Sequence, residues 1–335
     1  MSIKLSVVDQ SPVYGSHPAK ESPSLSATLA QACDQLGYYR YWVAEHHDSI
    51  HFANPCPEIL IAHIASITKN IRVGSGGVML NHYSPYKVAE CFKMLATLFP
   101  DRIDLGIGRA PGGTQLTSQA LSYFSRPHNG ELYATQAQDL KHFIDGSMPK
   151  DNAFHSLKVL PDNDPKPEMW MLGSSGGSAG LAGHLGYHIA LARFIDPDNC
   201  SPDIFKAHLN EWQKAKHAGT PNKMLAIACI CAETNEEARL IAGTAVYRKL
   251  AAQMGLREPF LTPEQVQDRY NALSHSYQSQ YDHILNGFTV GTATQCWDEI
   301  NQLTKAYQCD EIGLVTVTHS FQDRLQSYQL LAEAL

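Results

Sequence analysis

The run from Gly173 to Ser178 (GSSGGS) combines small residues with hydroxyl groups directly after a short apolar segment. Small residues allow backbone N–H groups to approach an anion, and the start of a following helix favours negative charge. Arg109, which ends another apolar segment, could add a charge-assisted hydrogen bond to the same anion. The pattern therefore predicts a phosphate site whose donors belong to Arg109, Ser174, Ser175, Gly176 and Ser178. A serine cap and tight turn without a ligand is the alternative interpretation of the run alone.

Other phosphate loops and a hydrolase site can be tested on the same residues. The segment 106–111 places Pro111 where a dinucleotide fingerprint needs its third glycine, and no Gly-Lys-Ser/Thr triplet occurs. The Gly173–Gly177 run also matches G-x-S-x-G, so Ser175 could be the nucleophile of a serine hydrolase. Its partners in chain order would be Asp310 and His319, but one precedes the last expected strand and the other follows it. A parallel strand would hold them at opposite ends of the sheet.

Two neighbouring histidines, His46 and His47, end the second apolar segment. Histidine suits proton transfer near neutral pH, although a hydrogen-bonded core histidine is the alternative. Side chains of neighbouring strand residues point to opposite faces, so we expect only one of the pair to face the site. Together with His51 they match no helical metal motif, and we predict no metal. Gly76 and Gly77, inside the third segment, indicate a bulge or a close approach by a ligand.

The elements that must position these residues follow one pattern along the chain. Short, mostly continuous apolar segments alternate with longer segments of helical periodicity, as in sheets buried on both faces. Eight such strand–helix units predict a closed (β/α)8 TIM barrel of the α/β class, whose chemistry lies at the carboxyl ends of the strands. An open doubly wound sheet is the alternative. The expected strands are Ile3–Val8, Tyr39–Ala44, Ile71–Leu80, Ile103–Ile107, Met169–Leu172, Tyr187–Ala192, Leu225–Cys231 and Ile312–Val317.

A single domain over residues 1–335 is the simplest organisation, because no linker, repeat or low-complexity tract interrupts the pattern. A barrel of this type typically needs about 250 residues. We expect the surplus in two insertions, Ala110–Leu132 after strand four and Gly255–Gly287 between strands seven and eight.

Charge and composition exclude several classes of function. Lys and Arg number 26 against 33 Asp and Glu, a formal net charge of −7, which gives no general attraction to nucleic acid or anionic membranes. The eight cysteines show no metal-ribbon or disulfide-framework spacing. No targeting or membrane-spanning segment is recognisable, so we expect a cytoplasmic protein.

Several of these segments resemble one known family. The segments Trp42–His47, Arg72–Leu80 and Arg102–Gly112 are similar to the luciferase-like monooxygenases, and within them to the MsnO8-like group of flavin-dependent oxidoreductases. The segments Asp9–Pro12, Leu172–Ser175 and Gly291–Thr292 match that group as well. The resemblance extends over essentially the whole chain.

The resemblance implies a barrel that binds reduced FMN, supplied by a separate flavin reductase, at its carboxyl-terminal mouth. By position, Arg109 and the Ser174–Ser178 turn match the residues that hold the flavin phosphate. Gly76-Gly77 matches a non-prolyl cis peptide that packs on the isoalloxazine ring, and His46 matches a catalytic histidine. The Gly255–Gly287 insertion occupies the place of a mobile active-site loop. The family also suggests a homodimer.

The implied function is a monooxygenase that uses reduced FMN and O2 to oxygenate a small organic substrate, aldehyde-like or apolar. A hydride-transfer oxidoreductase using the deazaflavin F420 on the same barrel, the serine hydrolase described above, and a flavin-storage protein are the alternatives. The chain departs from luciferase in having Gly108 where luciferase has a cysteine, and in lacking a glutamate in the phosphate turn. We therefore do not predict light emission.

Overall fold

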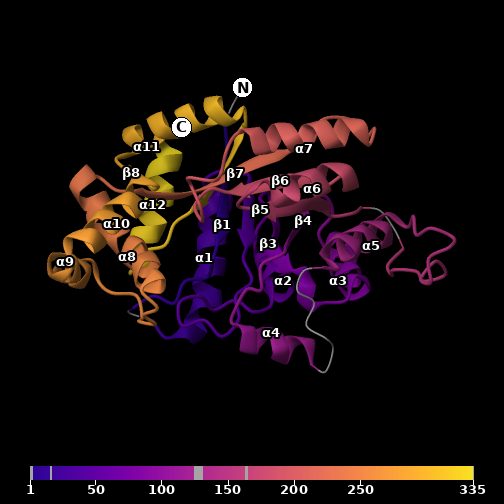
Figure 1. Cartoon of the computed structure of the whole chain (residues 1–335), viewed down its shortest axis with the longest axis horizontal. Coiled ribbons are helices and arrows are strands. Elements are labelled where there is room, and N and C mark those ends of the chain that lie inside the picture. Colours follow the sequence, from indigo (N-terminus) through magenta and orange to yellow (C-terminus); the bar gives the residue numbers. More distant parts are fainter. Residues whose placement is uncertain (1–2, 16, 124–130, 163–164, 335) are drawn as a thin grey trace.

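The eight predicted strands form a closed parallel barrel, which confirms the predicted fold class. The computed structural model describes residues 3–15, 17–123, 131–162 and 165–334. The sheet order is β6-β5-β4-β3-β2-β1-β9-β7-β8, and pairing between β6 and β7 closes it (Figure 1). The barrel strands are β1 Lys4–Asp9, β2 Arg40–Val43, β3 Arg72–Met79, β4 Ile103–Gly108, β5 Glu168–Gly173, β6 His188–Ala192, β7 Lys223–Cys231 and β9 Glu311–Val315.

One short strand was not predicted. β8 (Thr289–Gly291) pairs with the end of β7, where Cys229 lies opposite Thr289, and it adds an edge outside the closed ring. Three residues are too few to give a periodic signal, because strands are recognised over runs of four or more.

Helices cover the outside of the barrel. They are α1 Ser22–Gln35, α2 Pro57–Ile67, α3 Pro85–Leu98, α4 Gln115–Ser122, α5 Tyr133–Asp145, α6 Ala179–Leu185, α7 Asp203–Lys214, α8 Asn235–Gln253, α9 Pro263–Ala272, α10 His275–Asn286, α11 Ala293–Tyr307 and α12 Phe321–Glu333. Local chemistry sets several of their starts. Pro57 and Pro85 occupy the first helical position, where a missing N–H costs nothing. Thr262 and Thr292 form capping boxes with Gln265 and Gln295. No helix in the described ranges is long and apolar enough to cross a bilayer.

Both predicted insertions are present, and both contain helices. The insertion after β4 carries α4, and its residues 124–130 lie outside the described part of the chain. The second insertion forms α9 and α10, which pack against α8 (Figure 1). Tyr281 of α10 is buried there and packs against Tyr270 of α9, with ring centroids 5.0 Å apart.

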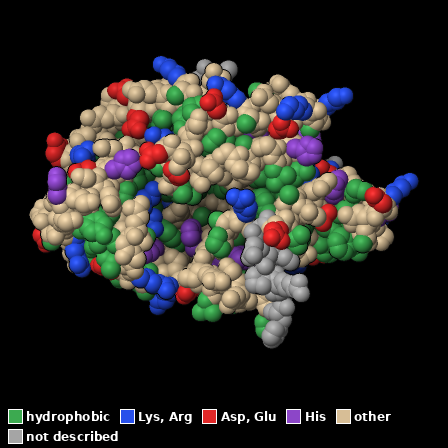
Figure 2. Space-filling model, viewed as in Figure 1, with side chains coloured by type: hydrophobic (Ala, Val, Ile, Leu, Met, Phe, Trp, Pro, Cys, Tyr) green, Lys and Arg blue, Asp and Glu red, His purple; other side chains and the backbone are tan. Residues whose placement is uncertain are grey.

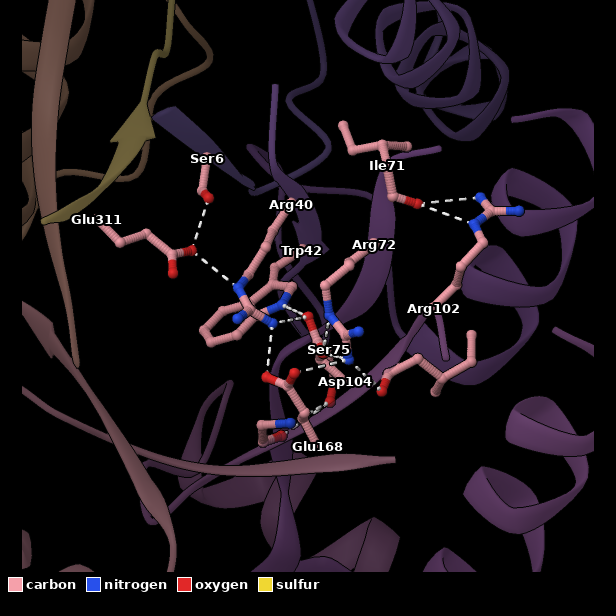
Figure 3. A network of polar contacts seen from close by, with 12 residues as sticks. Ser6, Arg40, Trp42, Ile71, Arg72, Ser75, Arg102, Asp104, Glu168 and Glu311 are labelled. Atoms are coloured by element: carbon pink, nitrogen blue, oxygen red, sulfur yellow. Dashed lines mark hydrogen bonds and ion pairs between the residues drawn. The ribbon is translucent and has the colours of Figure 1, made fainter. Parts of the chain in front are cut away.

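A buried ionic network fills the amino-terminal end of the barrel interior (Figure 3). Arg40 is fully buried and donates to Asp104 at 2.8 Å and to Glu311 at 2.9 Å. Asp104 also accepts from Arg72 and from the indole nitrogen of Trp42. This network fills the base of the barrel, opposite the carboxyl ends of the strands.

Candidate functional site

A cavity of about 1100 Å3 opens at the carboxyl-terminal mouth of the barrel. The side chains that point into the barrel change from charged at its base, to bulky rings in the middle, to small residues at its mouth. Along β2 and the loop that follows, these layers are represented by Arg40, Trp42 and Ala44. The small residues leave the space unfilled. They are Ala44, Gly76, Gly108, Ala190, Ala226 and Ala228. Figure 2 shows a hollow near the centre of this face, bordered by Lys, Arg and His side chains. The volume slightly exceeds the roughly 300–1,000 Å3 usual for small-molecule sites.

The residues predicted to bind phosphate converge on this cavity. Arg109, Ser174, Ser175 and Ser178 all line it, whereas Gly176 does not. A Cβ at Gly177 would lie 3.9 Å from Nη2 of Arg109, so the guanidinium reaches the turn after β5. Within the described ranges, the guanidinium forms no ion pair, and only the backbone carbonyl of Arg109 is engaged, by Asn81 at 2.7 Å. A cation and three hydroxyls are therefore available to one anion.

The conformation of the turn limits what its backbone contributes. Residues Gly176–Ser178 form one 3-10 turn, and the α-helix that follows has only seven residues. Gly173 leaves room for the observed rotamer of Ser178, because a Cβ at position 173 would overlap its Oγ. The affinity of this site for an anion therefore rests on Arg109 and the serine hydroxyls rather than on a long helix dipole.

Gly76 and Gly77 lie side by side in the cavity wall, and the peptide bond between them is cis. A Cβ at Gly76 would approach Cβ of Trp42 to 3.1 Å, and one at Gly77 would approach the carbonyl oxygen of Gly106 to 2.8 Å. A side chain at Gly77 would clash with backbone, and one at Gly76 would press tightly on Trp42. The pair therefore presents bare backbone to the cavity, a surface on which a flat ring can pack.

His46 lines the cavity and is held against Phe52, with ring centroids 4.6 Å apart. Its Nδ1 is buried and has no hydrogen-bond partner among the described residues. Burial lowers the pKa of His46 to about 4, and the positive charge of Arg248 acts in the same direction. The ring is therefore neutral at pH 7, and one of its two nitrogens carries a free lone pair.

His47 also lines the cavity, so the expectation that only one of the two histidines faces the mouth is wrong. β2 ends at Val43, and the strict alternation of side chains stops with it. The ring of His47 bonds to Glu45 at 2.6 Å, and Glu45 also accepts from the hydroxyl of Tyr83. His47 is thus anchored, whereas His46 retains a free ring nitrogen.

We expect the buried neutral state of His46 to make folding sensitive to acid. The pKa is about 4 in the folded protein against about 6.5 unfolded, so the unfolded chain takes up the proton first as the pH falls. The free energy of unfolding should fall between pH 6.5 and pH 4, by about 3 kcal/mol from His46 alone. Burial lowers the pKa of His188 to about 4 as well, and it adds to the loss.

Urea unfolding at several pH values measures this effect. His46→Gln should make the pH dependence shallower by close to one proton. Ile300→Val is the control, because it removes a buried methyl group of α11 without changing any titratable group and should lower stability equally at every pH. An unchanged slope in His46→Gln would show that the histidine is not buried in the neutral form.

Sequence reasoning missed three cationic residues of the cavity wall, Arg248, Lys249 and Arg257. Lys249 donates to the carbonyl of Phe194, and burial lowers its pKa to about 8. Arg257 pairs with Asp48 at 3.4 Å. An adjacent Arg-Lys pair inside the alanine-rich segment 242–252 is a signal that could have drawn attention to this helix.

The serine hydrolase site is not assembled. Ser175 lines the cavity, but Asp310 and His319 do not. Asp310 precedes β9 at the amino-terminal end of the barrel, where its carbonyl accepts from the backbone of Lys4. His319 follows β9 at the other end, beside Gly15. In the described part of the chain, no group of three or more His, Cys, Asp or Glu is arranged to hold a metal ion.

Comparison with known proteins adds an independent result to this geometry. The family model described as luciferase-like monooxygenase matches residues 3–307. The chain belongs to the luciferase-like monooxygenase family. It is 39% identical to the uncharacterized protein YwcH of Bacillus subtilis over 99% of both chains, and 34% identical to the N-acetyl-S-alkylcysteine monooxygenase of the same organism over 99% of this chain and 98% of that one.

A solved structure agrees over the full barrel. The crystal structure of apo-MsnO8 superimposes with a TM-score of 0.88 at 34% identity, covering 99% of this chain and 98% of that one. The resemblance predicted from the sequence motifs is thereby confirmed at the level of the family. As a luciferase-like monooxygenase, the protein is an oxidoreductase.

Proposed function

We propose that this luciferase-like monooxygenase binds reduced FMN and uses O2 to oxygenate a small organic substrate. The main support for this proposal is that Arg109 and three serines converge in the cavity. The wall of the same cavity also exposes the backbone of Gly76 and Gly77. A free cation with hydroxyls suits a phosphate monoester, and bare backbone suits an aromatic ring. These two surfaces fit the two ends of a flavin mononucleotide.

Residues of the chain would bind the phosphate, exclude water and accept a proton. When bound, reduced FMN would supply the activation of O2 that makes one oxygen atom available for transfer to the substrate. Arg109 and the serines would hold the phosphate, and the apolar side chains of Phe288, Val315 and Val317 would exclude water from the cavity. The neutral ring of His46 would accept a proton at the ring nitrogen that faces the cavity, which is not the enclosed Nδ1.

Oxygen transfer tests the proposal directly. Purified protein is mixed with chemically reduced FMN and isotopically labelled O2, together with aliphatic aldehydes and an N-acetyl-S-alkylcysteine, the substrate class named for the Bacillus relative. We expect a product that carries one labelled oxygen atom. Binding of F420 with no binding of FMN in either redox state would replace the proposal with hydride transfer on the same barrel. Bound flavin without any product would leave a flavin-storage protein.

His46→Ala is expected to lower turnover by about 10²–10⁴-fold while the affinity for FMN stays within a few-fold, because it removes a proton acceptor rather than an anion-binding group. Rates of product formation and a flavin titration measure the two effects separately. His319→Ala, which lies outside the cavity lining, is the matched control and should leave both unchanged. Full turnover in His46→Ala would remove His46 from the mechanism.

Two partners complete the proposal. The chain lacks a dinucleotide fingerprint, so we expect a separate reductase to deliver the reduced flavin. We also propose a homodimer, supported by exposed apolar side chains on the adjacent helices α2 and α3, namely Ile59, Met94 and Leu98. Sedimentation velocity should give the mass of two chains, and a monomer at micromolar concentration would contradict it.

A further inference from the structure

Arg248 extends into the cavity from α8, away from the group of residues assigned to phosphate. It belongs to a face of the helix formed by Ala245, Arg248, Lys249 and Ala252, all of which line the cavity. Their spacing of three and four residues places them on one side of an α-helix. Two alanines therefore flank the arginine and leave its guanidinium accessible from the cavity.

This guanidinium has no counter-charge within the described ranges. Nε is buried without a hydrogen-bond partner, and the side chain forms no ion pair with a described residue. Burial lowers the pKa of Arg248, and no charged neighbour contributes to the shift. The fully buried arginines Arg40 and Arg324 are paired, Arg40 with Asp104 and Glu311, and Arg324 with Asp9. A partly buried cation with an enclosed Nε and no counter-charge has lost part of its hydration, which a bound anion would replace.

The carboxylates of the cavity are already engaged. Glu45 accepts from His47 and from the hydroxyl of Tyr83. Asp48 pairs with Arg257. The anion that matches Arg248 must therefore come from a molecule in the cavity.

Arg248 also lies beside the candidate catalytic histidine. Its guanidinium carbon is 5.4 Å from the centroid of the Phe52 ring, and that ring packs against His46 with the two planes tilted by 40°. Arg109, by contrast, follows β4 and reaches the turn after β5. Among the described residues, the cavity thus offers two guanidinium groups without an ion pair at different places on the mouth, one near the serine turn and one near His46.

We propose that Arg248 binds a carboxylate of the substrate and makes this enzyme selective for small organic acids with an apolar body. An apolar body suits the walls beside the cation, which include Ala245, Ala252 and Phe52. The inference rests on the proposed function in placing the substrate in the flavin cavity. Arg248 is a specificity residue that fixes the acid group while the remainder of the molecule lies toward His46.

The test uses two matched probe pairs, octanoate with octanamide and phenylacetate with phenylacetamide, in the flavin-free protein. Trp42 lines the cavity, so quenching of tryptophan fluorescence reports binding. A hydrogen bond to a charged group predicts that the wild type binds the acid of at least one pair about ten- to hundred-fold more tightly than the amide. Arg248→Gln should abolish this preference, and Arg248→Lys should retain part of it.

Arg257→Gln is the matched control, because this cavity arginine is already paired, and it should keep the preference. Arg248→Gln should fold with an unchanged or higher midpoint of thermal unfolding, since it removes an unpaired cation. The proposal is overturned if the wild type shows no preference for an acid in either pair, or if Arg248→Gln preserves the preference.

FMN titrations show whether the anion that Arg248 binds is the flavin phosphate or a substrate carboxylate. If Arg248→Gln weakens FMN binding as strongly as Arg109→Gln does, Arg248 holds the flavin phosphate and the substrate assignment is wrong. A protein that binds no flavin but discriminates acid from amide through Arg248 would contradict the proposed function while supporting the acid site.

Discussion

Arg109→Gln is expected to weaken FMN binding by about ten- to hundred-fold. A charge-assisted hydrogen bond to phosphate contributes about 1.5–3 kcal/mol, and glutamine keeps a donor but loses the charge and the fork geometry. The guanidinium has no ion-pair partner in the described part of the chain, so its removal should not disturb a structural contact. Calorimetric titration with FMN measures the change in dissociation constant.

The matched control for that variant is Arg257→Gln. Arg257 lines the same cavity but is paired with Asp48, and we expect its replacement to change FMN affinity by less than about three-fold, as exposed ion pairs contribute little. Riboflavin affinity should be equal in wild type and Arg109→Gln, because riboflavin has no phosphate. An Arg109→Gln protein that binds FMN as tightly as the wild type would remove the arginine from the site.

Arg40→Met should lower the free energy of unfolding by about 3–5 kcal/mol, because it breaks a buried ionic network on one side only. Asp104 would keep Arg72 and the Trp42 indole as partners. Glu311 would keep only the hydroxyl of Ser6, at 2.7 Å. Burial raises the pKa of Glu311, and the charge of Arg40 opposes that rise. Urea unfolding at pH 7 measures the loss.

The double variant Arg40→Met/Glu311→Gln tests this cause. Neutralising Glu311 removes the uncompensated charge, so the double variant should recover part of the lost stability although it carries one more substitution. A further loss equal to that of Glu311→Gln alone would show that the two residues are not coupled. The cavity and the flavin affinity should change little in either protein, since Arg40 and Glu311 are the first residues of β2 and β9, at the end of the barrel opposite its mouth.

The sequence predicts the barrel well because parallel strands buried on both faces give continuous apolar runs. Each expected strand overlaps an observed one, with ends that differ by at most two residues. The charged layer at the base was not predictable in this way. Arg40 lies inside the second apolar run and Asp104 inside the fourth, and nothing local indicates that they meet across the barrel. Such a contact depends on register between strands that are distant in sequence.

In the candidate site, too, some residues could be predicted from the local sequence and others depend on tertiary packing. Arg109, the serine turn and His46 directly follow strands, and the fold alone brings strand ends together at one mouth. Arg248 lies on α8, and whether that helix faces the mouth or the solvent is decided by its packing against the barrel. The prediction for His47 is wrong because it extends the alternation of strand side chains into the loop after β2, which ends at Val43.

Arg109 and the Ser174–Ser178 turn are proposed to bind the phosphate of flavin mononucleotide, and the rest of the proposed function depends on this contact. Parallel calorimetric titrations of the wild-type protein with FMN and with riboflavin test it most directly. Several charge-assisted bonds to phosphate predict that FMN binds about a hundred-fold or more tightly than riboflavin. Equal affinities, or no heat with FMN in either redox state, would contradict the account.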